Sequence, residues 1–229
     1  AQLAELVNSI QALREEYPLF IAVDHEGGRV VRFKNHFTKI PAMLELAKTE
    51  SPKLCFKVLK LMAEELAICG VNVNLSPVCD VLSNKDNKVI GDRAFGSDPG
   101  KVSAFVSSAI RGLQTNGVLA CAKHFPGHGD TDKDSHKTLP TISHSKQRIN
   151  KVELVPFKNL INNGLGSVMT AHLFIPSLDS SDNTPISLSR KVVTGLLTQE
   201  MGFKGLKFTD GLNMKAVSDL YEPGDLDLK

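Results

Sequence analysis

Residues 117–136, GVLACAKHFPGHGDTDKDSH, join a short apolar run to fourteen positions that hold three histidines, three aspartates and two lysines. Pro126, Gly127 and Gly129 exclude a surface helix over the polar part, because proline and glycine disfavour helices. A buried strand is also disfavoured there, since each charge would need a partner. The stretch is therefore interpreted as a buried strand that leads directly into a polar, glycine-rich loop.

The same junction recurs along the chain. The apolar runs are PLFIAVD (18–24), GVNVNLS (70–76), GVLACAK (117–123), GSVMTAH (166–172) and GLKFTD (205–210). Their apolar residues are nearly continuous, which is typical of strands buried on both faces of a parallel sheet. Polar residues stand at or just after their carboxyl ends, where parallel α/β folds place their sites.

Segments with helical spacing and clear ends alternate with these runs. One begins at the expected N-cap Ser51 and stops at Gly70, and the next runs from Asp98 to Gly117. Residues 189–202, 2–16 and about 146–163 are the remaining candidates. Strand–helix alternation implies right-handed βαβ units and one α/β domain over residues 1–229.

A TIM (β/α)8 barrel fits this pattern better than a nucleotide-binding fold. No GxGxxG follows a strand, and no GK[ST] is present for a phosphate loop. A whole barrel takes about 250 residues and eight strands, whereas five strand-like runs are visible. We therefore expect an incomplete barrel, with strands missing at both ends and open edges that allow self-association.

The composition is that of a soluble globular protein. The chain has 229 residues, of which 41% are hydrophobic, and a formal net charge of +2. A charge so close to zero gives no reason to expect nucleic acid or a membrane surface as a partner. The four cysteines, none in a CxxC pair, are interpreted as core thiols in a reducing compartment.

Asp210 ends the last apolar run and precedes Gly211. Such an aspartate is often the N-cap of the next helix. Held on a rigid strand and aimed into a pocket, it could instead attack a sugar anomeric carbon and form a glycosyl ester. Both interpretations stay open on this residue alone.

Asp134 and His136 form an Asp-x-His pair in the polar loop. The carboxylate could orient the imidazole and stabilise its charged form, which leaves the other ring nitrogen to exchange a proton near neutral pH. A surface histidine without a catalytic role is the alternative. Zinc is a further alternative, for which the loop offers His124, His128, His136, Asp130, Asp132 and Asp134.

Charged residues near the strand ends favour a polar, hydroxyl-rich ligand. Asp24 could accept hydrogen bonds from two sugar hydroxyls. Arg32, Arg93, Lys123 and His124 supply donors. Each alone is more often a salt-bridge partner, and their shared placement is what favours a binding role.

Four stretches together resemble glycoside hydrolase family 3 β-N-acetylglucosaminidases, and within that family the NagZ-type branch that acts on muropeptides. They are AVDHEGGRVVRF, VIGDRAFGSDP, ACAKHFPGHGDTDKDSH and FTDGLNMKA. The resemblance covers essentially the whole chain, and KHFPGHGDT..DSH is specific to this branch. Gly211 departs from relatives, which usually carry Asp or Ala after the nucleophile.

The resemblance implies a TIM-barrel domain and a retaining, two-step hydrolysis in the bacterial cytoplasm, with no metal or organic cofactor. Carried over by motif, Asp210 would be the nucleophile, His136 the general acid/base and Asp134 its partner. Asp24, Arg32, Arg93, Lys123 and His124 would bind N-acetylglucosamine. A metal-dependent hydrolase and a non-catalytic sugar-binding barrel fragment remain as alternatives, and phosphate could replace water as the acceptor.

Overall fold

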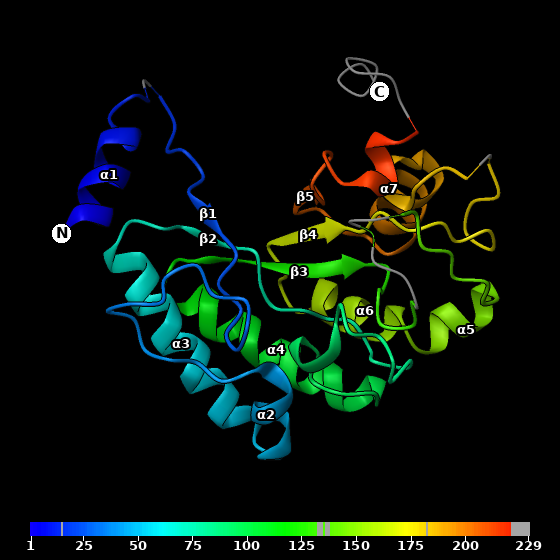
Figure 1. The fold of residues 1–229 in the computed structure, drawn as a ribbon, viewed down its shortest axis with the longest axis horizontal. Coiled ribbons are helices and arrows are strands. Elements are labelled where there is room, and N and C mark those ends of the chain that lie inside the picture. The colour runs from blue at the N-terminus through cyan, green and yellow to red at the C-terminus, as the bar shows by residue number, and fades with distance from the viewer. Residues whose placement is uncertain (15, 132–134, 136–137, 182, 221–229) are drawn as a thin grey trace.

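The computed structural model describes residues 1–14, 16–131, 135, 138–181 and 183–220. Its centre is a parallel sheet with the strand order β1-β2-β3-β4-β5. The strands are β1 (Ala22–Val23), β2 (Val73–Asn74), β3 (Leu119–Phe125), β4 (Ser167–Thr170) and β5 (Leu206–Thr209). Each strand pairs with its neighbour along the chain (Figure 1). The five predicted strands are therefore all present and in sequential order, as in a (β/α)8 barrel.

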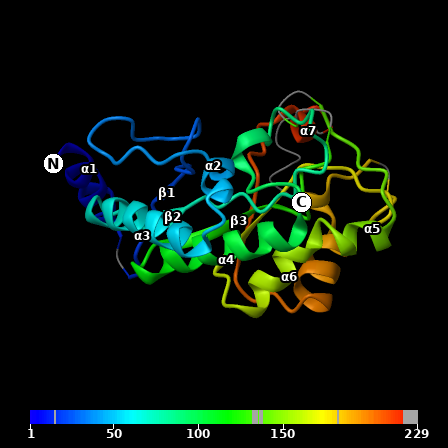
Figure 2. The same cartoon turned by 90° about the horizontal axis from the view of Figure 1, so that it is seen from below.

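Helices connect the strands, and α3, α4 and α6 lie along one side of the sheet (Figures 1 and 2). They are α1 (Gln2–Gln11), α2 (Met43–Lys48), α3 (Pro52–Ile68), α4 (Pro99–Thr115), α5 (Lys146–Lys151), α6 (Leu154–Asn162) and α7 (Lys215–Ser218), with short turns η1 (Gly91–Arg93) and η2 (Ile186–Leu188) and the π-helix η3 (Lys191–Glu200). Helix α4 packs against both α3 and α6. The result is the α/β half-barrel expected for part of a TIM barrel.

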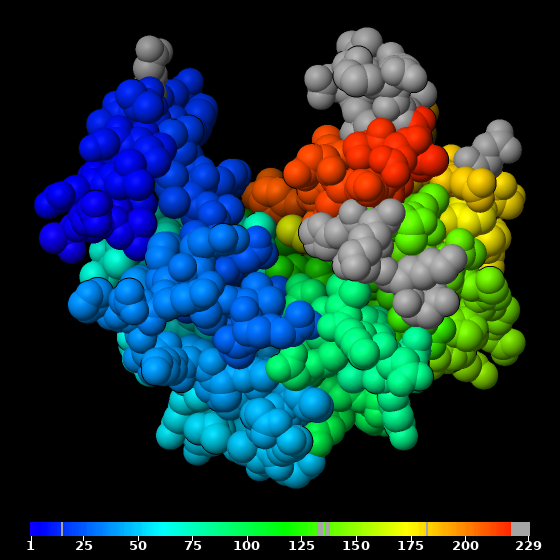
Figure 3. Space-filling view, viewed as in Figure 1, coloured from blue at the N-terminus to red at the C-terminus, as the bar shows by residue number. Residues whose placement is uncertain are grey.

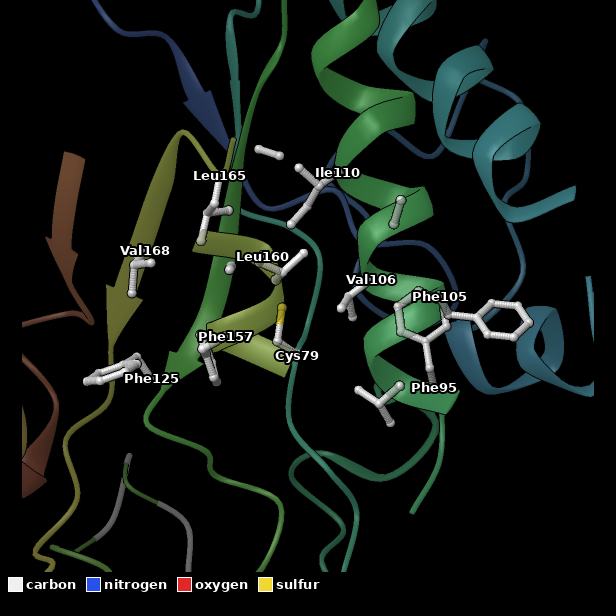
Figure 4. Close-up of a cluster of buried hydrophobic side chains, with 14 of the residues drawn as sticks. Cys79, Phe95, Phe105, Val106, Ile110, Phe125, Phe157, Leu160, Leu165 and Val168 are labelled. Atoms are coloured by element: carbon white, nitrogen blue, oxygen red, sulfur yellow. The ribbon is translucent and has the colours of Figure 1, made fainter. Parts of the chain in front are cut away.

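The hydrophobic core lies between β3 and β4 on one side and α4 and α6 on the other (Figure 4). Phe125 at the end of β3 meets Phe157 of α6 edge to face, with ring centroids 5.3 Å apart. Val106 and Ile110 of α4 are fully or almost fully buried in the same cluster. This packing ties the carboxyl end of β3, and so the start of the polar loop, to the helical layer.

Local sequence determines where the two longest helices begin and end. The Ser51 hydroxyl accepts a hydrogen bond from Leu54 N at 3.2 Å, and Asp98 Oδ1 accepts one from Lys101 N at 2.6 Å. Gly70 follows the end of α3 with φ of 83°. Both predicted N-caps are confirmed, because capping depends on residues only a few positions apart.

Several predicted boundaries are wrong. The helix expected over 2–16 ends at Gln11, and the one expected over 146–163 is two helices, α5 and α6. Glu153 stands at the break, buried and paired with Arg148 Nη1 at 2.7 Å. Strand β3 continues through Phe125, beyond the predicted run 117–123, so His124 is also a strand residue and the polar loop starts later.

The two edge strands differ from the three inner ones. β2, β3 and β4 are almost entirely buried, whereas β5 is largely exposed, with Leu206 at 40%. In space-filling view the molecule is hollowed between its N-terminal segment and the segment of β5 and α7 (Figure 3). Burial on both faces was therefore predicted correctly for the inner strands and wrongly for the edges. None of the described helices has the length and apolar character needed to cross a bilayer.

Candidate active site

A cavity of about 530 Å³ opens at the carboxyl ends of the strands. Six predicted site residues line it, namely Asp24, Arg32, Arg93, Lys123, His124 and Asp210. Its apolar wall comes from Val30, Leu75, Val89, Ile90 and Met169, and Glu26, His128, Ser135, Thr209 and Gly211 complete it. The predicted convergence of the strand ends on one pocket is confirmed for these residues.

The six come from several parts of the fold. Asp24 directly follows β1, Lys123 and His124 lie near the end of β3, and Asp210 directly follows β5. Arg93 ends the turn η1, and the exposed Arg32 belongs to the loop after β1. Asp24 and Asp210 are 186 positions apart in the sequence. They line the same pocket because parallel strands end at one edge of the sheet.

A buried carboxylate, Glu26, organises the cations of the pocket. Its Oε1 lies 2.7 Å from Lys123 Nζ and 2.8 Å from Arg93 Nη2, and its Oε2 accepts from Arg93 Nε at 2.8 Å. Lys123 Nζ also contacts Asp24 Oδ1 at 2.8 Å. Burial alone would raise the pKa of Glu26, but the two cations more than offset it and lower that pKa to about 2.

Asp80 plays the corresponding part for the histidines. Its Oδ2 lies 2.7 Å from His124 Nδ1, and its Oδ1 accepts hydrogen bonds from the backbone amides of His124 and His128. Burial alone would raise the pKa of Asp80, but these histidines lower it. With Nδ1 engaged by the carboxylate, His124 presents Nε2 on the other side of its ring, 3.5 Å from Arg93 Nη2.

Asp210 is half-buried and directly follows the carboxyl end of β5. Its Oδ1 accepts a hydrogen bond from Gly211 N at 2.8 Å. Burial alone would raise the pKa of Asp210, but His124, the Gly211 amide, His172 and Lys123 lower it. The helix-cap alternative is wrong, because α7 begins only at Lys215 and its N-cap is Met214. Asp210 is thus an ionised carboxylate facing the pocket.

Asp134 and His136, the predicted dyad, lie outside the described residues, as does Asp132. Ser135 between them is described and lines the pocket. Of the other residues considered for zinc, His128 is buried and Asp130 pairs with His144 Nε2 at 2.6 Å. Within the described ranges, no group of three His, Cys, Asp or Glu side chains could hold a metal ion.

Sequence reasoning left Glu26 and Asp80 without a role and considered His128 only as a zinc ligand. Glu26 and Asp80 each stand just after a strand, in AVDHEGG and SPVCD, so strand-end position alone could have identified them. What the sequence does not show is which cations they meet. Arg93 follows Glu26 by 67 positions, and His124 follows Asp80 by 44.

The fold and the site together define an α/β half-barrel with a charged pocket at its strand ends. Residues 1–227 match the glycosyl hydrolase family 3 N terminal domain. The chain therefore belongs to glycoside hydrolase family 3.

Individual relatives agree with this assignment. The chain is 41% identical over 222 residues to a β-hexosaminidase of Nitrosomonas eutropha, with 94% of this chain and 62% of the relative aligned. It is 36% identical to β-hexosaminidase A of Pseudoalteromonas piscicida, over 98% of this chain and 41% of the relative. The chain thus spans about two fifths to three fifths of the length of these curated relatives.

Solved structures share the fold closely. A family 3 β-N-acetylglucosaminidase from Paenibacillus superposes with a TM-score of 0.94 and 39% identity, covering 96% of this chain and 42% of the other. NagZ from Neisseria gonorrhoeae in complex with N-trifluoroacetyl-D-glucosamine superposes with a TM-score of 0.86 and 36% identity, covering 93% and 64%. Both structures are therefore similar to this chain in sequence as well as in fold.

Proposed function

We propose that this protein is a retaining exo-β-N-acetylglucosaminidase that removes terminal β-linked N-acetylglucosamine from peptidoglycan (muropeptide) fragments. The observation that carries the proposal is Asp210, an ionised carboxylate at the end of β5 in a pocket lined by cations and carboxylates. Family membership and the names of the relatives support the reaction class. A bacterial cytoplasmic location belongs to the same proposal.

The first step is attack of Asp210 on the anomeric carbon. A bond forms between a carboxylate oxygen and that carbon, and the bond from the carbon to the aglycone oxygen breaks. His136 donates a proton to the departing oxygen, and Asp134 stabilises the imidazole in this role. In the second step water attacks the same carbon, His136 accepts its proton, and Asp210 is released.

The polar groups of the pocket would hold the sugar in place for this attack. Asp24 is partly exposed and presents a carboxylate for two hydroxyl groups, while Lys123, His124, Arg93 and Arg32 supply donors. Glu26 holds Arg93 and Lys123 in place, and Asp80 holds His124. Little reorganisation of these donors is therefore needed when the substrate enters. Such pre-organisation is consistent with a catalytic pocket.

A substrate comparison tests the proposal. The protein is incubated with an aryl N-acetyl-β-glucosaminide and with the matching β-glucoside, and only the first should be cleaved. A 5-fluoro glycosyl probe should then label Asp210 covalently, which peptide mapping detects. Labelling of another residue, or equal cleavage of both glycosides, would contradict the assignment.

A chelator separates this function from the zinc-dependent alternative. Glycosidase activity should survive dialysis against EDTA, whereas a zinc hydrolase would lose activity and recover it when zinc is restored. A binding module without catalysis would retain the sugar and release no aglycone. Equilibrium dialysis with N-acetylglucosamine, run beside the activity assay, distinguishes that outcome.

A further inference from the structure

The carboxyl end of β4 holds the backbone that carries Asp210. Strands β4 and β5 lie side by side (Figure 1). The Asp210 amide donates to Thr170 O at 3.0 Å, which extends the ladder between the two strands by one residue. Two positions after Thr170, His172 Nε2 lies 3.1 Å from Gly211 O. Residues at and just after the end of β4 therefore contact both Asp210 and the residue that follows it.

The contact with Gly211 shows which nitrogen of the His172 ring carries a proton. A carbonyl oxygen can only accept, so Nε2 is the donor. His172 Nδ1 lies 2.6 Å from Ser187 Oγ, and in the neutral ring this nitrogen accepts from the hydroxyl. Ser187 belongs to η2, whose Ile186 amide donates to Leu173 O at 2.7 Å. Ser187 thus holds the ring in the orientation that directs Nε2 at the Gly211 carbonyl.

His172 lies behind the cavity and not in its wall. It is fully buried and stands outside the described lining, whereas Asp210 and Gly211 are part of that lining. Gly211 O also accepts from Met214 N at 2.9 Å, but Met214 belongs to the same turn and would move with Gly211. The hydrogen bond from His172, by contrast, ties this turn to β4.

The Gly211 amide connects the turn to the carboxylate of Asp210. It donates to Asp210 Oδ1 at 2.8 Å. Burial alone would raise the pKa of Asp210, and His124 and this hydrogen bond are among the causes that lower it. The direction of the carboxylate therefore depends on where the Gly211 backbone lies. Such dependence matters for a nucleophile, because a displacement of about 1 Å from the reacting geometry can cost on the order of 100-fold in rate.

We propose that His172 is a positioning residue for Asp210, which acts through Gly211 to orient the carboxylate for attack on the anomeric carbon. The inference rests on the proposed function, since it concerns the nucleophile of that reaction. Ser187 supports the role because it holds the His172 ring. Loss of the Nε2 donor should slow the attack and leave binding of the sugar nearly unchanged.

A 5-fluoro glycosyl fluoride derived from N-acetylglucosamine measures the attack in the whole protein. The Asp210 carboxylate forms a bond to the anomeric carbon, and fluoride departs with the electron pair of the bond that breaks. Fluoride is a good leaving group that needs little help from a general acid. The labelling rate at several probe concentrations separates kinact, the rate constant of attack, from KI, the dissociation constant of the probe. Peptide mapping identifies the labelled residue.

Two substitutions at one position separate the hydrogen bond from packing. His172→Gln retains an N–H donor near the place of Nε2, whereas the shorter side chain of His172→Asn reaches only as far as Nδ1. His172→Asn should lower kinact by about tenfold or more, and His172→Gln should stay within about threefold of wild type. In both variants KI should change by less than about twofold.

Ser187→Ala removes the hydroxyl that holds the ring and should lower kinact by about threefold or more. Ser167→Ala is its matched control. It also deletes a buried hydroxyl, which donates to Ala120 O at 2.9 Å at the amino end of β4, away from the cavity. The control should leave kinact and KI unchanged. Ser187→Ala decides the question where a His172 variant does not fold.

The wild-type protein separates failure of this inference from failure of the proposed function. If the probe does not label Asp210 in the wild type, the proposed function fails and the positioning role fails with it. If the wild type is labelled and His172→Asn reacts with the same kinact, only the positioning role is overturned. Equal losses in His172→Asn and His172→Gln, or a rise in KI without a fall in kinact, would also overturn it. So would equal kinact values in Ser187→Ala and Ser167→Ala.

Discussion

Replacing Glu26 by glutamine removes the negative charge that two cations share in the wall of the pocket. The carboxylate is 2% exposed and contacts Lys123 Nζ at 2.7 Å and Arg93 Nη2 at 2.8 Å. Glutamine has nearly the same size, but it replaces one acceptor oxygen with an NH₂ group that would face a cation. The variant therefore loses charge and hydrogen bonds without leaving a cavity.

The pKa of Glu26 gives the magnitude. A fall from the ordinary 4.5 to about 2 corresponds to about 3 kcal/mol of stabilisation at neutral pH. Breaking a buried ion pair by removing one partner costs about 3–5 kcal/mol, which agrees. At about 2–4 °C per kcal/mol for a protein of this size, Glu26→Gln should melt about 6–12 °C below wild type.

Urea unfolding at pH 7 measures the difference directly, with Glu200→Gln as the control. Glu200 pairs with Lys146 on the surface, where both side chains are 53% exposed, so its loss should change stability by less than about 1 kcal/mol. The depressed pKa of Glu26 also predicts a pH dependence. Its contribution is complete above pH 4.5 and is lost as pH falls towards 2. Equal stability of Glu26→Gln and Glu200→Gln at pH 7 would refute the reasoning.

Two further substitutions probe the proposed nucleophile and the loop. Asp210→Ala should lower kcat by several orders of magnitude on every glycoside. It should leave the melting temperature nearly unchanged, since Met214 rather than Asp210 is the N-cap of α7. A melting temperature many degrees lower would show that Asp210 has a structural role. Gly129→Ala should unfold the loop or the protein, because its Cβ would sit 1.8 Å from Val81 O, whereas Gly195→Ala meets no atom within 4 Å and should leave stability unchanged or raise it slightly. Differential scanning calorimetry compares the pair, and equal melting temperatures would contradict the close approach at Gly129.

Features decided by neighbouring residues were predictable from the sequence. Ser51 and Asp98 cap their helices as expected, and the five apolar runs became five parallel strands in order. The end of β3 was predicted at Lys123 instead of Phe125, because Lys123 and His124 look like the start of a loop when only their polarity is considered. Their burial depends on Glu26 and Asp80, which come from other parts of the chain. A charged residue can occupy a strand when a distant partner compensates its desolvation.

The position of the pocket could be predicted from the sequence, but the pairing of side chains within it could not. The position of a strand end depends only on the fold, so the sequence predicted that Asp24, Lys123 and Asp210 lie at one edge of the sheet. The pairing of Glu26 with Arg93, and of His128 with Ser135, depends on side-chain directions across different loops. Periodicity carries no information about such directions.

The arrangement of charges is consistent with the proposed role of Asp210 as nucleophile in a pocket that holds several cations. Glu26 engages Arg93 and Lys123, and Asp80 engages His124, so each of these donors is already paired from behind. Among the described residues, no Lys or Arg forms an ion pair with Asp210 within 4.0 Å, although His124 and Lys123 lie close enough to lower its pKa. A carboxylate that is ionised by nearby charge but not engaged in a salt bridge keeps its oxygen lone pairs available for attack. In the proposed mechanism Glu26 and Asp80 would therefore act indirectly, because they pair with the cations of the pocket while His124 and Lys123 still lower the pKa of Asp210.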